Sequence, residues 1–303
     1  MKKLISALLG ATLFCAPAIA AEPATTAAPA AQPTVDIDPA LWVVKDEDTT
    51  IYLFGTIHML KPGLGWFDDG VKKAFDASDE LVIEMIEPDS QTMMGVIQKL
   101  AMNPGAAPLS QQLGAQDRAA YTKALEALGI PYQAFEQARP WFAAMTLSAL
   151  PIAKLGYDPA NGPERILQDA AERAGKKIGQ LETAEEQLGF FAKLTDAEQI
   201  DYLNVTVRMQ DEIAPAIENL IALWSAADVE GVGNAMKEGM GNTPALDRVL
   251  LGERNTNWAG WIKTRLEQPG TVFLAVGAGH LAGEASVQTK LKALSIDTQR
   301  VQY

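Results

Sequence analysis

The chain has 303 residues, of which 25 are basic and 38 are acidic, so its formal net charge is −13. Hydrophobic residues make up 48% of the sequence and charged residues 21%, a profile that suits a globular chain with a large core. Low-complexity disorder, a collagen-like fibre and a small disulfide-stapled fold are therefore excluded. We also expect no nucleic-acid partner, because an acidic surface repels phosphate.

Residues 1–20 have the composition of a secretory signal peptide. Two lysines precede an apolar stretch at 4–14, and Ala18 and Ala20 offer the small residues that a signal peptidase recognises. A membrane span needs about 20 apolar residues, more than this stretch supplies. Cleavage would take the net charge from −13 to −15, because it removes two lysines and no acidic residue. We therefore expect a periplasmic or secreted protein with no integral membrane segment in the mature chain.

The single cysteine, Cys15, lies within this leader and leaves a lipoprotein form open as an alternative. Phe14 argues against that form, since it stands where a lipid-attachment signal usually has a small residue. Residues 21–40 contain four prolines among alanines and threonines, and we expect them to be a disordered linker. The remaining residues, 41–303, are expected to form one domain.

From residue 41 onward the pattern alternates between strands and helices. The β-prone runs predict strands, the first two of them forming a hairpin, at 41–44, 50–54, 80–85, 177–181, from 271 and near 297–303. Helical periodicity and capping signals predict helices at 66–77, 243–266 and 283–294, and a largely helical region at 89–240 that includes a helix at 140–155. This order predicts an α/β fold with a mixed β-sheet and a large helical insertion.

The two histidines of the chain share one local sequence context. His58 ends IYLFGTIH and His280 ends VFLAVGAGH, so each follows an apolar strand, a glycine and two small or apolar residues. Glycine allows a sharp turn at the carboxyl end of a strand, where α/β sheets usually hold ligands. The match indicates two pseudo-related halves that present both imidazoles to one site, as metal ligands or general bases. Two structural histidines at turns are the alternative.

Two carboxylates follow apolar strands in the same way. Glu84 ends the run LVIEM, which is typical of a strand buried on both faces. A buried, unpaired carboxylate is costly, so we expect Glu84 to meet a cation, a metal or a network of donors; an exposed strand end is the alternative. Glu182 ends KKIGQLE, and helix capping before TAEEQL is its alternative role.

Arg254 and Asn255 interrupt an otherwise apolar helix face that also carries Leu250 and Trp258. A guanidinium in such a stripe usually has a carboxylate partner or binds an anionic group. Arg254 and Asn255 therefore join the candidate site, with a purely structural ion pair as the alternative.

The segments GTIH, LVIEM, RPW, QLET, ERNTNW and GAGHL occur in this order, and with them the chain resembles the TraB/PrgY/GumN family, which includes the Tiki ectodomains. The resemblance covers nearly all of 41–303 and is closest to the bacterial GumN-like branch. It implies a fold shared with erythromycin esterases and haem-binding ChaN-like proteins. Tiki members are divalent-metal-dependent proteases that use both GxxH histidines and a glutamate. Carried over, the metal ligands are His58, Glu84 and His280, and Arg254 and Asn255 fall on the RN motif.

The leading hypothesis is a metal-dependent hydrolase, a peptidase, with Mn²⁺ or Co²⁺ as its ion and a peptide or other small substrate. Glu182 is the expected general base, and Arg254, grouped with Asn255 in the catalytic set, would stabilise an oxyanion or anchor a substrate carboxylate. Capture of a peptide or of haem in the same crevice, without turnover, is the alternative. A metal-independent esterase with His58 as its base is the third hypothesis. The substrate and the oligomeric state stay open.

Overall fold

The computed structural model describes residues 34–241 and 243–303. The expected leader at 1–20 and most of the expected linker lie outside these residues. The strands are β1 Val35–Asp36, β2 Leu41–Lys45, β3 Thr49–Thr56, β4 Leu64–Gly65, β5 Glu80–Ile83, β6 Lys177–Gln180, β7 Gly270–Gly277 and β8 Gln299–Arg300.

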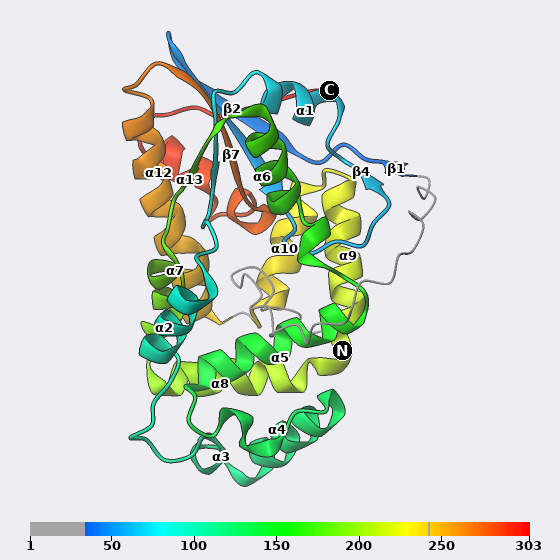
Figure 1. Cartoon of the computed structure of the whole chain (residues 1–303), viewed down its shortest axis with the longest axis vertical. Helices are drawn as coiled ribbons and strands as arrows, with labels where there is room; N and C mark the ends of the chain where they lie inside the picture. The colour runs from blue at the N-terminus through cyan, green and yellow to red at the C-terminus, as the bar shows by residue number, and fades with distance from the viewer. Residues whose placement is uncertain (1–33, 242) are drawn as a thin grey trace.

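Six of these strands form one mixed sheet in the order β6-β5-β7-β3-β2-β8. The four strands β6, β5, β7 and β3 are parallel, and β2 is antiparallel to both β3 and β8. β2 and β3 form the predicted hairpin, in which Leu41 pairs with Phe54. Because the four parallel strands run in the same direction, their carboxyl ends meet at one edge of the sheet, which faces the helical part of the molecule (Figure 1). The predicted α/β fold with a mixed sheet is confirmed.

Helices occupy most of the remaining chain. The α-helices are α1 Asp69–Asp76, α2 Ser90–Leu100, α3 Leu109–Gln112, α4 Ala115–Leu128, α5 Pro140–Lys154, α6 Pro163–Ala174, α7 Ala184–Ala192, α8 Asp196–Arg208, α9 Ile213–Ser225, α10 Val229–Gly239, α11 Pro244–Asp247, α12 Glu253–Arg265 and α13 Val287–Ala293. The shorter turns are η1 Tyr132–Phe135, η2 Pro159–Asn161, η3 Gln210–Glu212, η4 Arg248–Gly252 and η5 Ala278–Leu281. No helix in the described ranges has both the length and the apolar composition of a transmembrane span.

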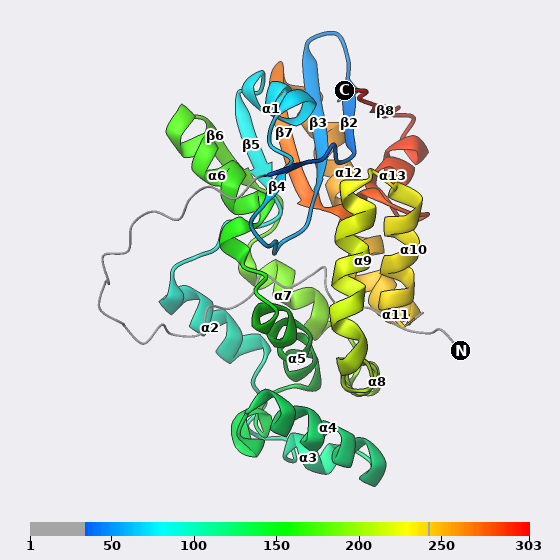
Figure 2. The same cartoon turned by 90° about the vertical axis from the view of Figure 1, so that its right-hand side faces the viewer.

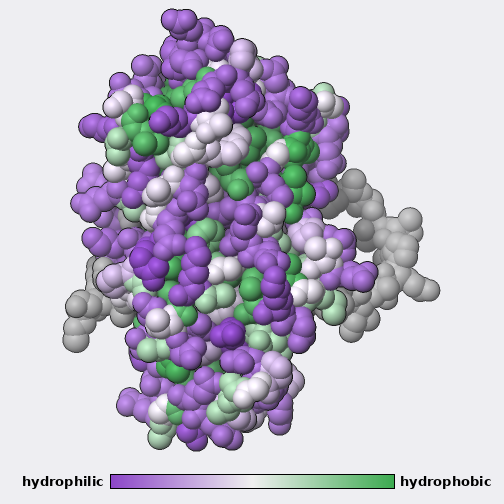
Figure 3. All heavy atoms as spheres, turned by 90° about the vertical axis from the view of Figure 1, so that its left-hand side faces the viewer, coloured by the Kyte–Doolittle hydropathy of each residue, from purple (hydrophilic) through white to green (hydrophobic). Residues whose placement is uncertain are grey.

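The alternation of side chains along the strands produces two apolar layers, one on each face of the sheet. Phe54 and Phe273 point to one face, where they pack with α1, α6, α9 and α10. Leu53 and Leu274 point to the other face, where they pack against α12 and α13. Helices α2, α4, α5, α7 and α8 share a third apolar cluster beyond the carboxyl edge of the sheet (Figures 1 and 2). Polar side chains cover most of the surface on the side of α12, α7 and α2, and apolar ones form separate patches (Figure 3).

Residues near the end of the expected linker make backbone contacts with a later segment of the chain. The backbone N–H of Val35 donates to the carbonyl of Gly63 at 2.8 Å, and that of Ile37 donates to Gly65 at 3.0 Å, so that β1 pairs in parallel with β4. These contacts use backbone groups alone and leave Val35 exposed. Residue composition therefore gives no sign of them.

The helix expected over 243–266 is interrupted by a π turn. α11 and α12 flank the segment η4, Arg248–Gly252, whose hydrogen bonds follow the wider π pattern. A π turn adds about one residue to a helix, and it therefore rotates the side chains of α12 relative to those of α11. Arg254 and Asn255 follow it directly, and both are fully buried. The expected helix at 66–77 starts only at Asp69, because Trp66 instead stacks on Phe54, with ring centroids 5.4 Å apart.

Candidate functional site

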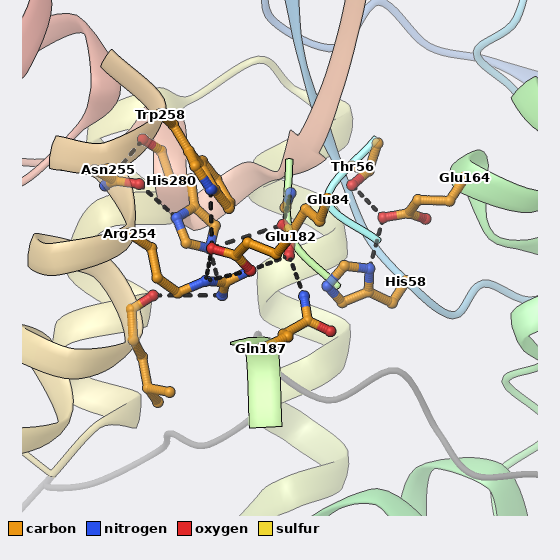
Figure 4. Close-up of polar contacts among 12 residues, drawn as sticks. Thr56, His58, Glu84, Glu164, Glu182, Gln187, Arg254, Asn255, Trp258 and His280 are labelled. Carbon is orange, nitrogen blue, oxygen red and sulfur yellow. Dashed lines mark hydrogen bonds and ion pairs between the residues drawn. The ribbon is translucent and has the colours of Figure 1, made fainter. Parts of the chain in front are cut away.

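The carboxyl edge of the sheet collects four of the residues that the sequence singles out. His58 follows β3, Glu84 follows β5, Glu182 follows β6 and His280 follows β7. Figure 4 shows them in one cluster with Arg254, which comes from α12. This is the edge at which α/β sheets usually bind ligands.

The glycines of the two GxxH motifs have a role other than the expected sharp turn. Neither Gly55 nor Gly277 has a positive φ. Gly55 instead allows the two motifs to pack together, because a Cβ added there would lie 3.1 Å from the Cα of Ala278. The backbone N–H of Gly277 donates to Glu84 Oε1 at 2.7 Å. Close packing thus explains the glycine at position 55, whereas the N–H at position 277 is a donor that any residue except proline would supply.

Arg254 is the centre of a buried ion-pair cluster. Its Nη2 lies 2.6 Å from Glu84 Oε2 and 2.8 Å from Glu182 Oε2, and its Nε donates to Glu182 at 3.0 Å. Its Nη1 donates to the carbonyl of Leu250 at 3.5 Å and to His280 Nε2 at 3.1 Å. All five N–H groups of the guanidinium therefore have partners within the protein. The expected ion pair is observed, and Arg254 orients both carboxylates.

Glu84 is an ionised carboxylate with fixed geometry. Besides Arg254 and the Gly277 N–H, it accepts a hydrogen bond from Gln187 Nε2 at 3.1 Å. Burial alone would raise the pKa of Glu84, but the charge of Arg254 and the neighbouring histidines lower it to about 2. Two of the partners expected from the sequence are therefore observed, a cation, Arg254, and a network of hydrogen-bond donors.

Glu182 has both oxygens engaged. They accept from Arg254, and Oε1 also accepts from the indole N–H of Trp258 at 2.9 Å. Burial raises the pKa of Glu182, against the opposing effect of Arg254. Helix capping, its alternative role, belongs instead to Thr183 and Glu186, which form a capping box. Glu182 borders a pocket between α7 and α12 that is also lined by Phe190 and Trp261. The role of Glu182 as a general base stays a prediction.

His280 is fully buried and held in one tautomer. Asn255 Nδ2 donates to the carbonyl of Ala285 at 2.7 Å, which turns Asn255 Oδ1 toward His280 Nδ1 at 2.6 Å. Nδ1 must then carry the proton, and Nε2 accepts from Arg254 because a guanidinium has no acceptor. Burial and the positive charge of Arg254 lower the pKa of His280 to about 3. His280 is therefore neutral, and the lone pair of its Nε2 is used by the hydrogen bond from Arg254.

His58 is bound differently, by a carboxylate that the sequence analysis missed. Its Nδ1 donates to Glu164 Oε1 at 2.6 Å, and Thr56 Oγ1 donates to the same oxygen. Burial lowers the pKa of His58, but the Glu164 and Glu84 charges outweigh it and raise the pKa to about 9. The other ring nitrogen, Nε2, turns toward Glu84 (Figure 4) and makes no hydrogen bond with the residues described. Glu164 lies in the first turn of α6, where carboxylates are common as helix starts.

The donor set fits a divalent cation beside His58 and Glu84. A histidine that donates Nδ1–H to a carboxylate and leaves Nε2 open is the usual arrangement of a metal-binding imidazole. Glu84 and Glu182 pair with Arg254, and Glu164 pairs with His58. The three carboxylates exceed the positive charges by one when His58 is protonated, and by two when a bound cation replaces the proton on its Nε2. In the described part of the chain, no three His, Cys, Asp or Glu side chains already form a metal-binding group. His280 Nε2 lies 3.7 Å from Glu84 Oε1 but accepts from Arg254, so its coordination of a metal stays a prediction.

The spacing between Gly162 and His58 leads to a prediction about the His58–Glu164 pair. A Cβ at Gly162 would collide with the carbonyl oxygen of His58 and lie 2.9 Å from its carbonyl carbon. Backbone atoms cannot rotate away, so Gly162→Ala should lower the free energy of unfolding by roughly 1–3 kcal/mol, measured by urea denaturation. Gly95→Ala is the control, since a Cβ there meets nothing within 4 Å. An equal effect of the two variants would contradict this explanation.

Comparison with known proteins identifies the family of the chain. The model of the TraB/PrgY/gumN family matches residues 40–300. "Uncharacterized protein YbaP" from Escherichia coli (strain K12) is 25% identical over 254 residues, covering 84% of this chain and 92% of that protein. An "Uncharacterized protein" from Treponema pallidum (strain Nichols) is 24% identical over 264 residues, covering 81% and 78%. No solved structure gives a significant match. Since the family model spans the whole sheet and every residue of the site, the chain belongs to the TraB/PrgY/gumN family.

Proposed function

We propose that the protein is an exported metal-dependent hydrolase that cleaves peptides, with its reaction centre between His58 and Glu84. The observation that carries this proposal is the state of His58. Its Nδ1 is fixed by Glu164, and its Nε2 faces an ionised carboxylate across the carboxyl edge of the sheet. The basic and apolar start of the chain supports export.

The centre is suited to Mn²⁺ or Co²⁺. Imidazole and carboxylate ligands together are acceptable to such ions, and the excess of negative charge calls for a cation. A divalent ion held by His58 and Glu84 would lower the pKa of a bound water and polarise a scissile carbonyl.

The surrounding residues keep these two ligands in place. Glu164 and Thr56 fix the ring of His58. Arg254, Gly277 and Gln187 fix the carboxylate of Glu84 and keep it ionised. Asn255 affects Glu84 only indirectly. It orients His280, and His280 accepts a hydrogen bond from Arg254. We therefore assign Arg254 and Asn255 positioning roles, because their polar groups already have partners in the protein.

The test is cleavage of a defined peptide library by the purified mature chain, followed by mass spectrometry. We expect cleavage with added Mn²⁺, its loss with a chelator, and a rate at least about 100-fold lower for His58→Ala. Arg208→Ala is the control, because Arg208 makes an exposed ion pair with Asp117 at 3.3 Å. Thermal melts establish that both variants fold. Cleavage that is unaffected by the chelator or by His58→Ala overturns the proposal, and so does binding of peptide or haem without any cleavage.

A further inference from the structure

Gln187 occupies an unusual position beside the proposed centre. It lies on α7 and is 3% exposed. Its amide nitrogen donates to Glu84 Oε2 at 3.1 Å. The orientation of the amide is therefore determined, because the opposite orientation would place an oxygen against a carboxylate. The carbonyl oxygen must face away from Glu84.

That carbonyl oxygen is buried and has no partner among the described residues. Leaving a buried acceptor unsatisfied costs about 1–3 kcal/mol, so native proteins usually provide it with a donor or an ion. In Figure 4 the oxygen points to the side of His58, into the space that also faces the open Nε2 of the imidazole. The capping box at the start of α7 fixes the turn from which Gln187 projects.

An unsatisfied oxygen alone does not identify a ligand. Gln199 on α8 also has a buried carbonyl oxygen without a described partner, while its amide nitrogen donates to the carbonyl of Leu194 at 2.8 Å. Its amide group, unlike that of Gln187, makes no contact with a carboxylate of the site. At Gln187 the oxygen without a partner lies beside the imidazole of His58 and the carboxylate of Glu84, in a site with an excess of negative charge. Those neighbours select a cation.

We infer that Gln187 Oε1 is a ligand of the divalent cation, which it would bind together with His58 Nε2 and the carboxylate of Glu84. This inference rests on the proposed function and adds a residue to its site. The three groups supply one nitrogen and two kinds of oxygen donor, a set that suits Mn²⁺. They leave room for water, as a catalytic rather than a structural site requires.

In this arrangement His280 is a positioning residue and not a ligand of the cation. Its Nε2 already accepts from Arg254 at 3.1 Å, whereas Gln187 Oε1 is free. Gln187 thus provides the third donor without any movement of the guanidinium. His280 then acts by orienting Arg254 behind Glu84.

The test measures Mn²⁺ binding directly, by titration calorimetry and by the electron paramagnetic resonance of free Mn²⁺, in the full mature chain. Gln187→Met keeps the length of the side chain but removes both the oxygen and the amide nitrogen that donates to Glu84, and we expect its Kd for Mn²⁺ to rise at least about 10-fold. Gln187→Glu restores an oxygen donor and should bind Mn²⁺ at least as tightly as the parent. Gln199→Met is the matched control and should leave the Kd unchanged. Urea denaturation establishes that each variant folds.

The outcomes separate this inference from the proposed function. If the parent binds Mn²⁺ and His58→Ala does not, while Gln187→Met binds like the parent, Gln187 is not a ligand but the proposed function stands. Weak binding by both Gln187→Met and Gln187→Glu assigns Gln187 a structural role and also overturns the inference. If the parent itself binds no Mn²⁺, the proposed function fails and the inference fails with it.

Discussion

Replacing Arg254 with methionine should lower the free energy of unfolding by about 3–5 kcal/mol, the usual cost of removing one partner from a buried ion pair. The guanidinium is 1% exposed and lies between Glu84 and Glu182, both nearly as buried. Without it, two carboxylates remain in a site of low dielectric with few other donors. Methionine preserves much of the length and apolar volume, so the loss reports the charge rather than a cavity. Urea denaturation at neutral pH measures it.

Arg165→Met is the control for this result. Arg165 pairs with Asp169 at 2.8 Å, one turn along α6, but its side chain is 58% exposed. Exposed pairs of this kind contribute about 0–1 kcal/mol, so the control should lose little stability. A similar loss in the two variants would show that Arg254 does not compensate the buried carboxylates.

Replacing Glu164 with glutamine should weaken Mn²⁺ binding by about 10–100-fold, the range measured when the outer partner of a metal-binding histidine is removed. The carboxylate fixes the proton on His58 Nδ1 and directs Nε2 toward Glu84. A glutamine amide can present its nitrogen to the ring instead, and it carries no charge to increase the basicity of the imidazole. Titration calorimetry measures the affinity, and the rate of peptide cleavage should fall in parallel.

Glu172→Gln, at an exposed position of the same helix, is the control for Glu164→Gln. It removes one negative charge from α6 without contact to His58. If both variants lose the same affinity, the effect is one of net charge, and the orienting role of Glu164 is wrong.

The parts of the site that lie next to strands could be predicted from the sequence. An apolar run followed by a polar residue marks the end of a buried strand, and this pattern identified His58, Glu84 and His280. The stripe of α12 identified Arg254 and Asn255 as buried, because apolar neighbours recur at helical spacing around them. The meeting of His58, Glu84 and His280 at one edge of the sheet followed from the rule that α/β sheets bind ligands at the carboxyl ends of their strands.

Glu164 and Gln187 could not be predicted in this way. A glutamate after a proline at a helix start resembles any carboxylate that complements the helix dipole, and its partner His58 is 106 residues away. Gln187 is a polar residue one turn into a helix, and no local feature reveals its contact with Glu84. The π turn before Arg254 also leaves no recognisable signal, because its residues are ordinary helix formers.

The order of the strands has a consequence for how the molecule is made. β7, which begins at residue 270, lies between β5 and β3, although both of these come from the first third of the chain. During synthesis, β3 and β5 therefore cannot join one sheet until β7, in about the last tenth of the polypeptide, has been made. A fragment that stops before Gly270 therefore lacks both the strand that joins β5 to β3 and the residue His280.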